Sequence, residues 1–395
     1  MTLKGLPRVT ISHRGAQRLS AGHPWVFSGD VRDDGGAVSG DVVLVQQRRR
    51  SGKLRVLGCA FFNRESMITL RLIESGEAVI DRAFWRRRLQ QALELRARLA
   101  DEDQAGRLVF AESDGIPGLI ADRYHQVIVL QTLCAGAERL RRQWVELLQE
   151  LTGVDTFVER NDTAARRLEG LPERAGMLQG RLAGPLQVRL GGLLRTIDPL
   201  AGQKTGGYLD QRHNHRRAGQ LARGRCLDVF SYQGGFGLSL AAGGGTPVTL
   251  LDQSERALEI ARADAASNRL QVETRCGNAF DVLRGLQQQG QRFHTICLDP
   301  PAFAKNKRAL ESALRGYKEI NLRALKLLEP GGLLITSSCS YHLSVDLFED
   351  ILLQAARDAR RQVQLLERRG AASDHPERLG FPESRYLKCL LLRAW

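Results

Sequence analysis

The C-terminal half of the chain alternates short apolar runs with amphipathic segments. The runs Thr295–Leu298 and Gly332–Thr336 have the length and branched side chains of buried strands. Between them, Leu310–Leu328 has helical periodicity and is expected to end at Glu329-Pro330-Gly331. Such a strand–helix–strand unit forms a right-handed parallel crossover. The polar residues that follow each strand should therefore lie at the carboxyl edge of one sheet, where open α/β sheets bind ligands.

The same alternation extends over residues 191–395. Further strands are predicted at 225–230, 246–251, 271–276, 363–367 and 385–392. Ser254 is a predicted N-cap for the helix Glu255–Asn268. Strands that alternate with helices in this way indicate an α/β fold with a doubly wound, Rossmann-like parallel sheet.

The first 190 residues have a different pattern. Short alternating runs at 9–12, 41–45, 55–61 and 68–72 predict a compact, mostly β domain over residues 1–75. Residues 76–190 combine predicted helices at 80–99 and 138–151 with strands at 126–133 and 156–159, and with two strands around Ser113-Asp114-Gly115. We interpret them as a separate α+β domain with a linking or RNA-shaping role, in which Asp114 and Asp122 are turn and cap residues.

The net positive charge of the chain indicates a polyanionic partner. The formal net charge is +14, and residues 1–100 hold 18 Lys and Arg against 9 Asp and Glu. A basic excess concentrated in one region favours nucleic acid, although solvated arginine faces are the alternative. Arg48–Arg50 are expected at a hairpin tip that suits phosphates. His23 and Trp25 could contact RNA, but a tryptophan in such a position is more often a core residue.

Cysteine content and hydropathy exclude several classes of protein. Seven cysteines without a Cys-x-x-Cys pair support neither a disulfide framework nor a zinc knuckle, so we predict no metal and a reducing, cytoplasmic location. The N-terminus has no apolar core of signal-peptide length. The uncharged run Val229–Leu251 contains six glycines, which favours a glycine loop between strands over a membrane segment.

The glycine loop is the candidate cofactor site. Gly234-Gly235-Phe236-Gly237 follows the strand that contains Asp228. A dinucleotide site would need Gly-x-Gly-x-x-Gly to seat a pyrophosphate, and an acid inside the first strand repels pyrophosphate but suits an ammonium group. Asp252, Asn278 and Asp299 end the successive strands. This set favours S-adenosylmethionine over a nicotinamide cofactor. The polar loop at 202–212 lacks the Gly-x-x-x-x-Gly-Lys-Ser/Thr spacing of a nucleotide triphosphatase.

Taken together, several motifs resemble the bacterial 23S rRNA cytosine-carbon-5 methyltransferases of the RlmI type. They are Gly-Gln-Lys-Thr-Gly-Gly-Tyr-Leu-Asp-Gln-Arg at 202–212, Leu-Asp-Val-Phe-Ser-Tyr-Gln-Gly-Gly-Phe at 227–236, Asp-Pro-Pro-Ala-Phe-Ala-Lys at 299–305, Ser-Ser-Cys-Ser at 337–340 and the segment 374–388. The resemblance covers nearly the whole chain. It implies a PUA-type RNA-binding domain (1–75), a central domain (76–190) and a class I methyltransferase domain (191–395). It also implies RNA, either 23S rRNA or an assembling large ribosomal subunit, as the partner, and a homodimer.

From these motifs, and from the ends of the strands between them, we assign a set of residues to cofactor binding. They are Gln203, Lys204, Thr205, Asp210, Arg212, Asp228, Phe230, Tyr232, Gly234, Gly235, Asp252, Ser254, Asn278, Ala279 and Asp299. The chain departs from the family pattern at Gly207, where an aromatic residue is usual, and at Asn278, where an Asp usually faces the adenine amino group. Asn keeps a carbonyl acceptor, so weakened rather than lost binding is expected.

The predicted catalytic residues are Cys339, Asp299, Pro300, Phe303 and Lys305. Carbon 5 of cytosine is a poor nucleophile, and attack of a thiolate on carbon 6 activates it. Cys339 would be that thiolate, and Lys305 would help to depress its pKa. Asp299 would bind the base edge, Pro300 would stiffen the backbone and Phe303 would stack on the extruded ring.

Alternatives remain open at this stage. The position after Pro300, where many RNA cytosine methyltransferases carry a second Cys, is Pro301. Asp-Pro-Pro is also a signature of enzymes that methylate nitrogen atoms, so an RNA guanine or adenine N-methyltransferase is one alternative. A non-enzymatic RNA-binding or ribosome-assembly protein is another. Tyr341 and His342 are both candidates for the base that removes the carbon-5 proton.

Overall fold

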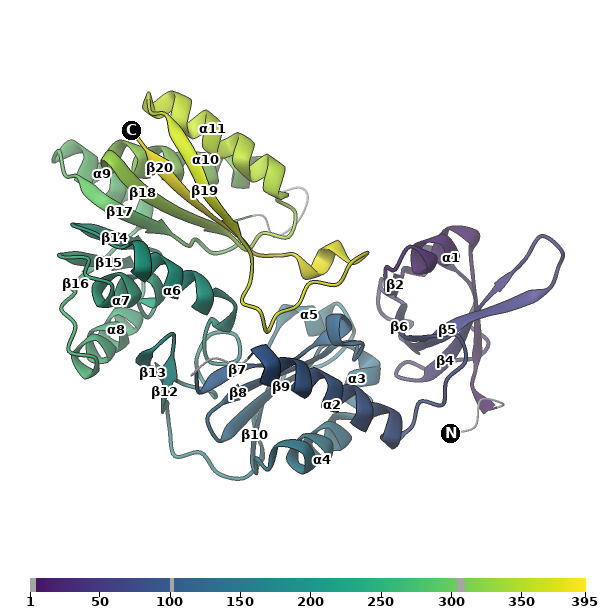
Figure 1. The fold of residues 1–395 in the computed structure, drawn as a ribbon. Helices are drawn as coiled ribbons and strands as arrows, with labels where there is room; N and C mark the ends of the chain where they lie inside the picture. Colours follow the sequence, from purple (N-terminus) through teal and green to yellow (C-terminus); the bar gives the residue numbers. More distant parts are fainter. Residues whose placement is uncertain (1–4, 100–102, 304–309) are drawn as a thin grey trace. The chain divides into compact units, whose positions relative to one another are not determined.

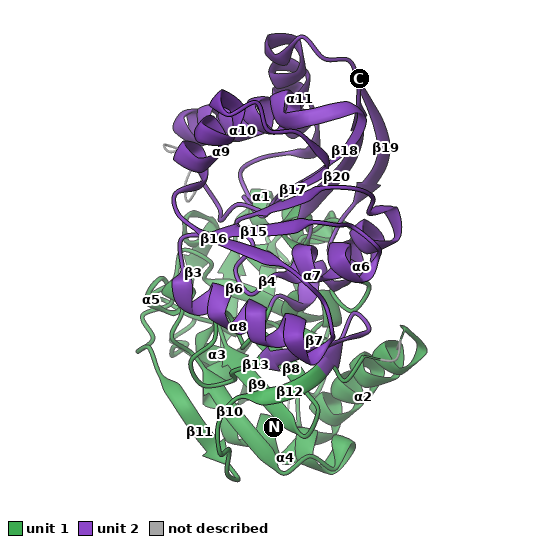
Figure 2. Ribbon diagram, turned by 90° about the vertical axis from the view of Figure 1, so that its left-hand side faces the viewer, with its two compact units in different colours: residues 1–188, 197–207, 373–384 green, residues 189–196, 208–372, 385–395 purple. Residues whose placement is uncertain are grey.

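The computed structural model describes residues 5–99, 103–303 and 310–395. The chain divides into two compact units, each of which is described by itself (Figure 2). Unit 1 comprises residues 1–188, 197–207 and 373–384, and unit 2 comprises residues 189–196, 208–372 and 385–395. Both units are therefore built from segments that are distant in sequence.

Unit 2 is organised around a seven-stranded sheet with the order β16-β15-β14-β17-β18-β20-β19 (Figure 1). Its strands are β14 (Cys226–Val229), β15 (Val248–Asp252), β16 (Glu273–Cys276), β17 (Phe293–Leu298), β18 (Leu328–Ser338), β19 (Val363–Arg369) and β20 (Lys388–Ala394). The pairs among β14 to β18 are parallel, and β20 is antiparallel to both of its neighbours. The predicted doubly wound α/β sheet is confirmed, including the two C-terminal strands that complete it.

Helices cover both faces of this sheet (Figure 1). One face holds α6 (Arg212–Leu221), α7 (Gly235–Ala242) and α8 (Glu255–Ser267), and the other holds α9 (Ala279–Gln288), α10 (Leu310–Leu327) and α11 (Val345–Ala359). Successive strand residues enter opposite cores: Leu250 packs with the α7 side, whereas Leu251 packs with the α9 side. This alternation explains why the strands are apolar throughout.

One predicted boundary in unit 2 is wrong. The segment Glu329-Pro330-Gly331 was expected to end a helix as a turn, but it belongs to β18, which begins at Leu328. The pairing with β17 shifts register between Phe293 and Thr295, and Gly331 has a φ of 81°. The irregularity that Pro and Gly impose is therefore a bulge inside the strand rather than a loop before it.

Unit 1 contains two sheets. The first, with the order β2-β6-β5-β4-β1-β3, is made of β1 (Arg8–Ile11), β2 (Trp25–Val26), β3 (Val31–Asp33), β4 (Val42–Arg48), β5 (Leu54–Phe62) and β6 (Leu70–Ser75), with helix α1 (His13–Ser20). The second, with the order β11-β10-β9-β8-β7, is made of β7 (Ala105–Phe110), β8 (Leu119–Tyr124), β9 (Val127–Thr132), β10 (Thr156–Arg160) and β11 (Ala175–Gln179). Its helices are α2 (Arg82–Leu99), α3 (Ala135–Arg139), α4 (Arg141–Thr152) and α5 (Ala164–Arg167). The hairpin β12 (Leu186–Leu190) and β13 (Leu193–Ile197) follows in the chain.

The two sheets of unit 1 share a hydrophobic core. Phe61 of β5 stacks on Trp85 of α2 with ring centroids 5.6 Å apart, and Trp85 meets Trp144 of α4 edge to face at 5.1 Å. Buried Arg71 of β6 is paired with Glu112 at 2.6 Å and with Glu169 at 2.8 Å. Residues 1–75 and 76–190 therefore form distinct sheets in one packed unit, and the boundaries at 75 and 190 remain predictions.

Several N-terminal residues have clear structural roles. Trp25 is half-buried; it donates a hydrogen bond from Nε1 to Glu112 at 2.7 Å and packs against Phe381, so it has a structural role within unit 1. Arg48–Arg50 are exposed at the tip of the β4–β5 hairpin, as predicted. Asp114 is a turn residue, as predicted: it ends the short turn Ala111–Asp114 between β7 and β8, and its carboxylate also forms a bidentate pair with Arg96. Asp122 is not a turn or cap residue. It lies within β8, where its fully buried carboxylate forms a bidentate pair with Arg107.

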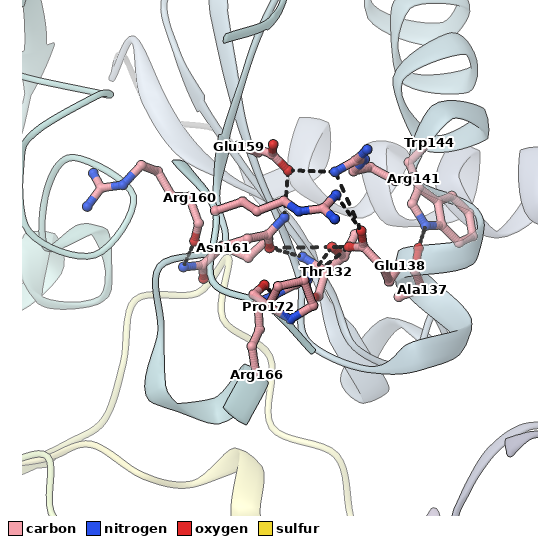
Figure 3. Close-up of polar contacts among 12 residues, drawn as sticks. Thr132, Ala137, Glu138, Arg141, Trp144, Glu159, Arg160, Asn161, Arg166 and Pro172 are labelled. Atoms are coloured by element: carbon pink, nitrogen blue, oxygen red, sulfur yellow. Dashed lines mark hydrogen bonds and ion pairs between the residues drawn. The ribbon is translucent and has the colours of Figure 1, made fainter. Parts of the chain in front are cut away.

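A buried polar network fixes the loop that follows β10 (Figure 3). The fully buried Arg166 donates hydrogen bonds to the carbonyl of Thr132, to the carbonyl of Pro172 and to Glu138, at 2.5, 2.9 and 2.9 Å. Asn161 Oδ1 accepts from the Thr132 amide at 2.7 Å. These contacts connect α5 to β9 and α3, so the second sheet of unit 1, which contains β9 and β10, is a rigid element.

Within the described residues, no helix has both the length and the apolar character that crossing a membrane requires.

Candidate active site

Five of the predicted site residues lie at the carboxyl ends of consecutive strands in the unit 2 sheet. Asp228 lies in β14, Asp252 ends β15, and Asn278, Asp299 and Cys339 follow β16, β17 and β18. The strand order places β14 between β15 and β17. Because these strands are parallel, the structure brings all five residues to one edge of the sheet, where an open α/β fold binds its ligand.

The loop after β14 approaches this edge with little room for side chains. Phe230, Tyr232 and Gly234 have φ values of 62°, 48° and 77°. A Cβ on Gly237 would lie 1.9 Å from a methyl carbon of Leu250 and 3.0 Å from Asp228 Oδ2. A Cβ on Gly235 would lie 2.4 Å from the ring of His215. The glycines are therefore required by close packing as well as by backbone conformation.

Asp228 is the strongest indication of a cationic ligand. Its carboxylate is buried, and Oδ2 accepts a hydrogen bond from the Gly237 amide at 2.7 Å. Within the described residues, Oδ1 is buried without a hydrogen-bond partner. Burial raises the pKa of this carboxyl to about 8, and the charges of Asp299 and Asp252 add to that effect, against the opposing Gly237 amide. An ammonium group would satisfy Oδ1, so the residues fit the methionine moiety of S-adenosylmethionine.

Asp252 organises the same loop. Its Oδ2 accepts from the Tyr232 amide at 2.8 Å and its Oδ1 accepts from the Ser254 amide at 2.9 Å. Ser254 caps α8 as predicted, accepting from the Ala257 amide at 3.2 Å. The half-buried carboxylate retains further lone pairs that can accept from ribose hydroxyls.

Asn278 is exposed and is the N-cap of α9. Its Oδ1 accepts from the Phe280 amide at 2.9 Å, and Ala279 is the first residue of the helix. The carbonyl that would accept from the adenine amino group is thus already engaged in the cap, and only its second lone pair can serve a ligand.

The 202–212 motif divides between the two units. Gln203, Lys204 and Thr205 belong to unit 1, whereas Asp210 and Arg212 belong to unit 2. Thr205 is buried and bonded to Tyr124 at 3.0 Å and to Asp122 at 2.7 Å, whereas Gln203 and Lys204 are exposed. Gly207 is buried, and a Cβ there would lie 2.9 Å from Ile197, so an aromatic side chain would require Ile197 to move.

In unit 2 the end of this motif orients the Asp299 carboxylate. Gln211 Nε2 donates to Asp299 Oδ1 at 2.9 Å, and Asn214 Nδ2 donates to Gln211 Oε1 at 2.7 Å. Asp210 accepts from the Tyr386 hydroxyl at 2.7 Å, and Arg212 is buried in the first turn of α6. Gln211 was not among the predicted site residues, although it stands inside the motif.

Asp299 is followed by the buried Pro300 and then by Phe303. The Phe303 ring lies 4.8 Å from Tyr317, 6.2 Å from Phe280 and 6.3 Å from Phe230. This half-buried ring is thus held in an aromatic cluster beside the core, and base stacking by Phe303 remains a prediction. Lys305 lies outside the described residues.

The thiols differ in accessibility. All seven cysteines are reduced; five are buried, Cys339 is half-buried and Cys276 is exposed. Cys276 is exposed because it lies in β16, which is the edge strand of its sheet. Burial raises the pKa of Cys297 and Cys389, and Glu255 contributes to a raised pKa at Cys276. These three thiols are poorly suited to form a thiolate.

The loop around Cys339 is held by hydroxyls and by one lysine. Ser338 Oγ donates to the Tyr317 hydroxyl at 2.9 Å, and the Tyr317 hydroxyl bonds to Ser340 Oγ at 3.0 Å. Lys388 Nζ donates to the Ser340 carbonyl at 2.7 Å. Lys388 was missed among the site residues; the available signal was an isolated charge within the apolar run 387–392.

Arg195 and His215 contact the glycine loop and were also missed among the site residues. Arg195 is buried and donates to the Gln233 carbonyl at 2.7 Å and to Asp264 at 3.2 Å. His215 meets the Phe236 ring edge to face at 4.5 Å, and burial lowers its pKa to about 3, so it is neutral. Neither residue lies in a motif, and only the fold places them against the loop.

Comparison with known proteins agrees with this geometry. Residues 9–75 match the PUA-like domain, and residues 175–393 match the S-adenosylmethionine-dependent methyltransferase family. Ribosomal RNA large subunit methyltransferase I of Shewanella denitrificans is 40% identical over 398 residues, which cover 98% of this chain and 99% of the relative. The protein of the same name from Klebsiella pneumoniae subsp. pneumoniae is 40% identical over 404 residues, which cover 100% of both chains.

Solved structures support the fold. A putative S-adenosylmethionine-dependent methyltransferase from Streptococcus mutans matches with a TM-score of 0.82 at 18% identity, over 98% of this chain and 100% of that one. A putative methyltransferase complexed with SAH matches with a TM-score of 0.83 at 18% identity and the same coverage. Together with the full-length relatives, these matches confirm the predicted PUA-type and methyltransferase domains, the cofactor and the family resemblance. The chain belongs to the S-adenosylmethionine-dependent methyltransferases and, among them, to the family of ribosomal RNA large subunit methyltransferase I.

Proposed function

We propose that this protein transfers a methyl group from S-adenosylmethionine to carbon 5 of a cytosine in 23S rRNA, through a transient bond between Cys339 Sγ and carbon 6. The names of the full-length relatives support large-subunit rRNA as the substrate. The PUA-like domain and the basic first 100 residues support RNA binding. The observation that carries the cysteine assignment is that Cys339, a half-buried thiol, lies at the carboxyl edge that also holds Asp228 and Asp299.

The chemistry requires a thiolate, an oriented acid and a flipped base. The Cys339 thiolate bonds to carbon 6, and the electron pair of the 5,6 double bond moves toward carbon 5, which becomes nucleophilic. Bound S-adenosylmethionine supplies the methyl group that carbon 5 accepts. A base then takes the carbon-5 proton, the electrons of that C–H bond restore the double bond, and the C6–S bond breaks to return the thiolate.

The other side chains of the site bind and orient. In this proposal Asp228 holds the methionine ammonium, and Asp252 accepts from the ribose hydroxyls. The Asn214–Gln211–Asp299 chain fixes one oxygen of the Asp299 carboxylate. In the proposed complex this oriented carboxylate meets the donor edge of the pyrimidine. A carboxylate oriented in this way selects a base with an exocyclic amino donor, which cytosine has and uracil lacks.

The test is methyl transfer to 23S rRNA by Cys339→Ala, with nucleoside mass spectrometry of the product. We expect 5-methylcytidine from the unaltered protein and a loss of about 1,000-fold or more in kcat/KM for the variant. Affinity for S-adenosylmethionine should remain within about threefold, because the proposed role of Cys339 is to bond to the pyrimidine and not to the cofactor. Cys276→Ala, which removes the exposed thiol, is the matched control and should retain activity.

Each contrary outcome identifies a different alternative. Methyl transfer retained in Cys339→Ala, with methylated guanine or adenine as the product, would establish an N-methyltransferase that uses Asp-Pro-Pro without a covalent step. Binding of rRNA without binding of S-adenosylmethionine would establish a non-enzymatic RNA-binding role.

A further inference from the structure

Lys388 is buried beside the proposed nucleophile. It is the first residue of β20 and stands directly opposite Ser338 in the antiparallel pairing with β18. Only 3% of the residue is exposed. A lysine is rarely buried to this extent unless its ammonium is compensated. Packing alone therefore does not explain why a lysine is buried at position 388.

The immediate partners of the ammonium are neutral. Nζ donates to the Ser340 carbonyl at 2.7 Å and to the Tyr386 carbonyl at 2.8 Å. Within the described residues, no carboxylate forms an ion pair with Lys388. The two carbonyls use two of the three N–H donors. The backbone of Lys388 pairs with Ser338, and its ammonium bonds to Ser340. Lys388 therefore contacts both chain neighbours of Cys339.

The charges of Lys388 and Cys339 act on each other. Burial lowers the pKa of Lys388 to about 8, and the charge of Cys339 opposes that decrease. Among the described residues, Tyr317 and Tyr208 are two further titratable groups whose pKa the charge of Cys339 affects. Burial raises the pKa of Tyr317 on α10 and of Tyr208, with Asp299 adding to the increase at Tyr208, so both phenols are neutral near pH 7. Lys388 is thus a cation, set in a region of low dielectric, whose field reaches the thiol.

We propose that Lys388 is a positioning residue for the methyl-transfer reaction, whose buried ammonium stabilises Cys339 as the thiolate and fixes the carbonyl of Ser340 beside it. This inference rests on the proposed function of Cys339. An opposite charge near a thiol favours its ionised form, as it does for a carboxyl. The two carbonyl bonds hold the ammonium in place next to the loop that carries Cys339. The arrangement therefore combines charge and orientation in a single side chain.

The experiment measures the pH at which Cys339 reacts with iodoacetamide, in the full-length protein carrying Cys276→Ala to remove the exposed thiol. With Lys388 intact, the midpoint should lie below about 8.5, the value of an unperturbed thiol. Lys388→Met keeps the length of the side chain but removes its charge. It should raise the midpoint by about one unit or more and slow alkylation at pH 7 about tenfold. Lys388→Arg keeps the charge and should retain the lower midpoint.

Methyl transfer supplies the second measurement. In Lys388→Met, kcat/KM should fall about 10- to 100-fold at pH 7 and recover toward the unaltered value at pH 9, while affinity for S-adenosylmethionine changes less than about threefold. A residue that only stabilised the loop would lower activity equally at both pH values. That result, or an unchanged alkylation profile in Lys388→Met, would overturn the inference.

Two outcomes keep this inference separate from the proposed function. If Cys339→Ala is inactive but the alkylation profile does not depend on residue 388, the function stands and the role of Lys388 is refuted. If Cys339→Ala stays active, the function fails, whatever the profile shows. Should Lys388→Met not fold, the alkylation midpoint of the Lys388 protein still decides, because a value at or above about 8.5 contradicts thiolate stabilisation.

Discussion

At the scale of single residues, Asp228 shows how burial changes the protonation of a carboxyl group. Its Oδ2 is bonded to the Gly237 amide, whereas Oδ1 is buried and, within the described residues, unsatisfied. The unbound protein therefore favours the neutral acid, and an ammonium ligand favours the carboxylate. Protonation, stability and cofactor binding are linked through this one group.

This linkage determines whether the free energy of unfolding rises or falls with pH. The pKa of Asp228 is raised from 3.8 to about 8, so between these values the folded protein holds a proton that the unfolded chain has released. The free energy of unfolding should therefore fall as pH rises from 4 toward 8, by up to about 1.4 kcal/mol per pH unit from this group. Urea unfolding at a series of pH values measures the slope. Asp228→Asn should remove that contribution.

Cofactor affinity should change in the opposite direction. In the proposed site the ammonium of the cofactor binds the Asp228 carboxylate, so affinity for S-adenosylmethionine should increase between pH 6 and 7.5 by up to about tenfold per unit. Calorimetry in buffers of different ionisation enthalpy should detect release of a proton at pH 6.5. An affinity that is independent of pH, equal in Asp228→Asn and the unaltered protein, would remove Asp228 from the cofactor site.

At the scale of elements, the sequence predicts the helices, strands and caps that depend on a local residue pattern. It misses features that depend on contacts with residues distant in the chain. The strands of unit 2, the Ser254 cap and the ligand edge follow from apolar runs and from the residues that end them. The start of β18 at Leu328 was missed, because pairing with β17 overrides the Pro-Gly signal at 330–331. Lys388 and Arg195 could not be assigned, because their partners lie 48 and 38 residues away in the chain.

The junction between β14 and α7 offers a test at the scale of elements. A Cβ on Gly237 would lie 1.9 Å from Leu250 and 3.0 Å from Asp228, so Gly237→Ala must push α7 away from β15. We expect a loss of about 1–3 kcal/mol in the free energy of unfolding. Since the Asp228–Gly237 bond would be distorted, cofactor affinity should also fall at least about tenfold. Urea unfolding and calorimetry measure the two effects.

Gly285 in α9 is the matched control for this change. A Cβ there meets no atom within 4 Å, and its backbone is helical. Gly285→Ala should leave affinity unchanged and raise stability by about 0.5–1 kcal/mol, because alanine loses less backbone entropy in a helix. Similar effects of the two substitutions on affinity would mean that the Gly237 contact does not shape the cofactor site.

At the scale of the whole molecule, chemistry and charge belong to different parts of the chain. The strand ends that form the candidate site lie in unit 2. The basic excess is concentrated in residues 1–100, which belong to unit 1. The shared core of its two sheets and the Arg166 network (Figure 3) give unit 1 a rigid interior, so its exposed arginines are presented on a stable surface. Substrate affinity and cofactor affinity should therefore respond to separate substitutions.

The hairpin tip tests this separation. Arg48, Arg49 and Arg50 are exposed, and the triple change to Gln removes three charges at the end of β4 and β5. If they contact phosphates, the slope of log Kd against log salt for a 23S rRNA fragment should fall by about 2–3, with a matching loss of affinity at low salt. Affinity for S-adenosylmethionine should not change. Fluorescence anisotropy at several salt concentrations measures the slope.

A control with the same change in net charge distinguishes contact from overall attraction. Arg82, Arg86 and Arg142 are paired with Glu150 and Glu146, so each of these arginines already has a local counter-charge. Their triple change to Gln also removes three charges, but it should alter the salt slope by less than about one. If both triple variants lose equal affinity and equal slope, the hairpin makes no specific contact. RNA would then respond only to the total charge of the molecule, and the predicted phosphate role of Arg48–Arg50 would be wrong.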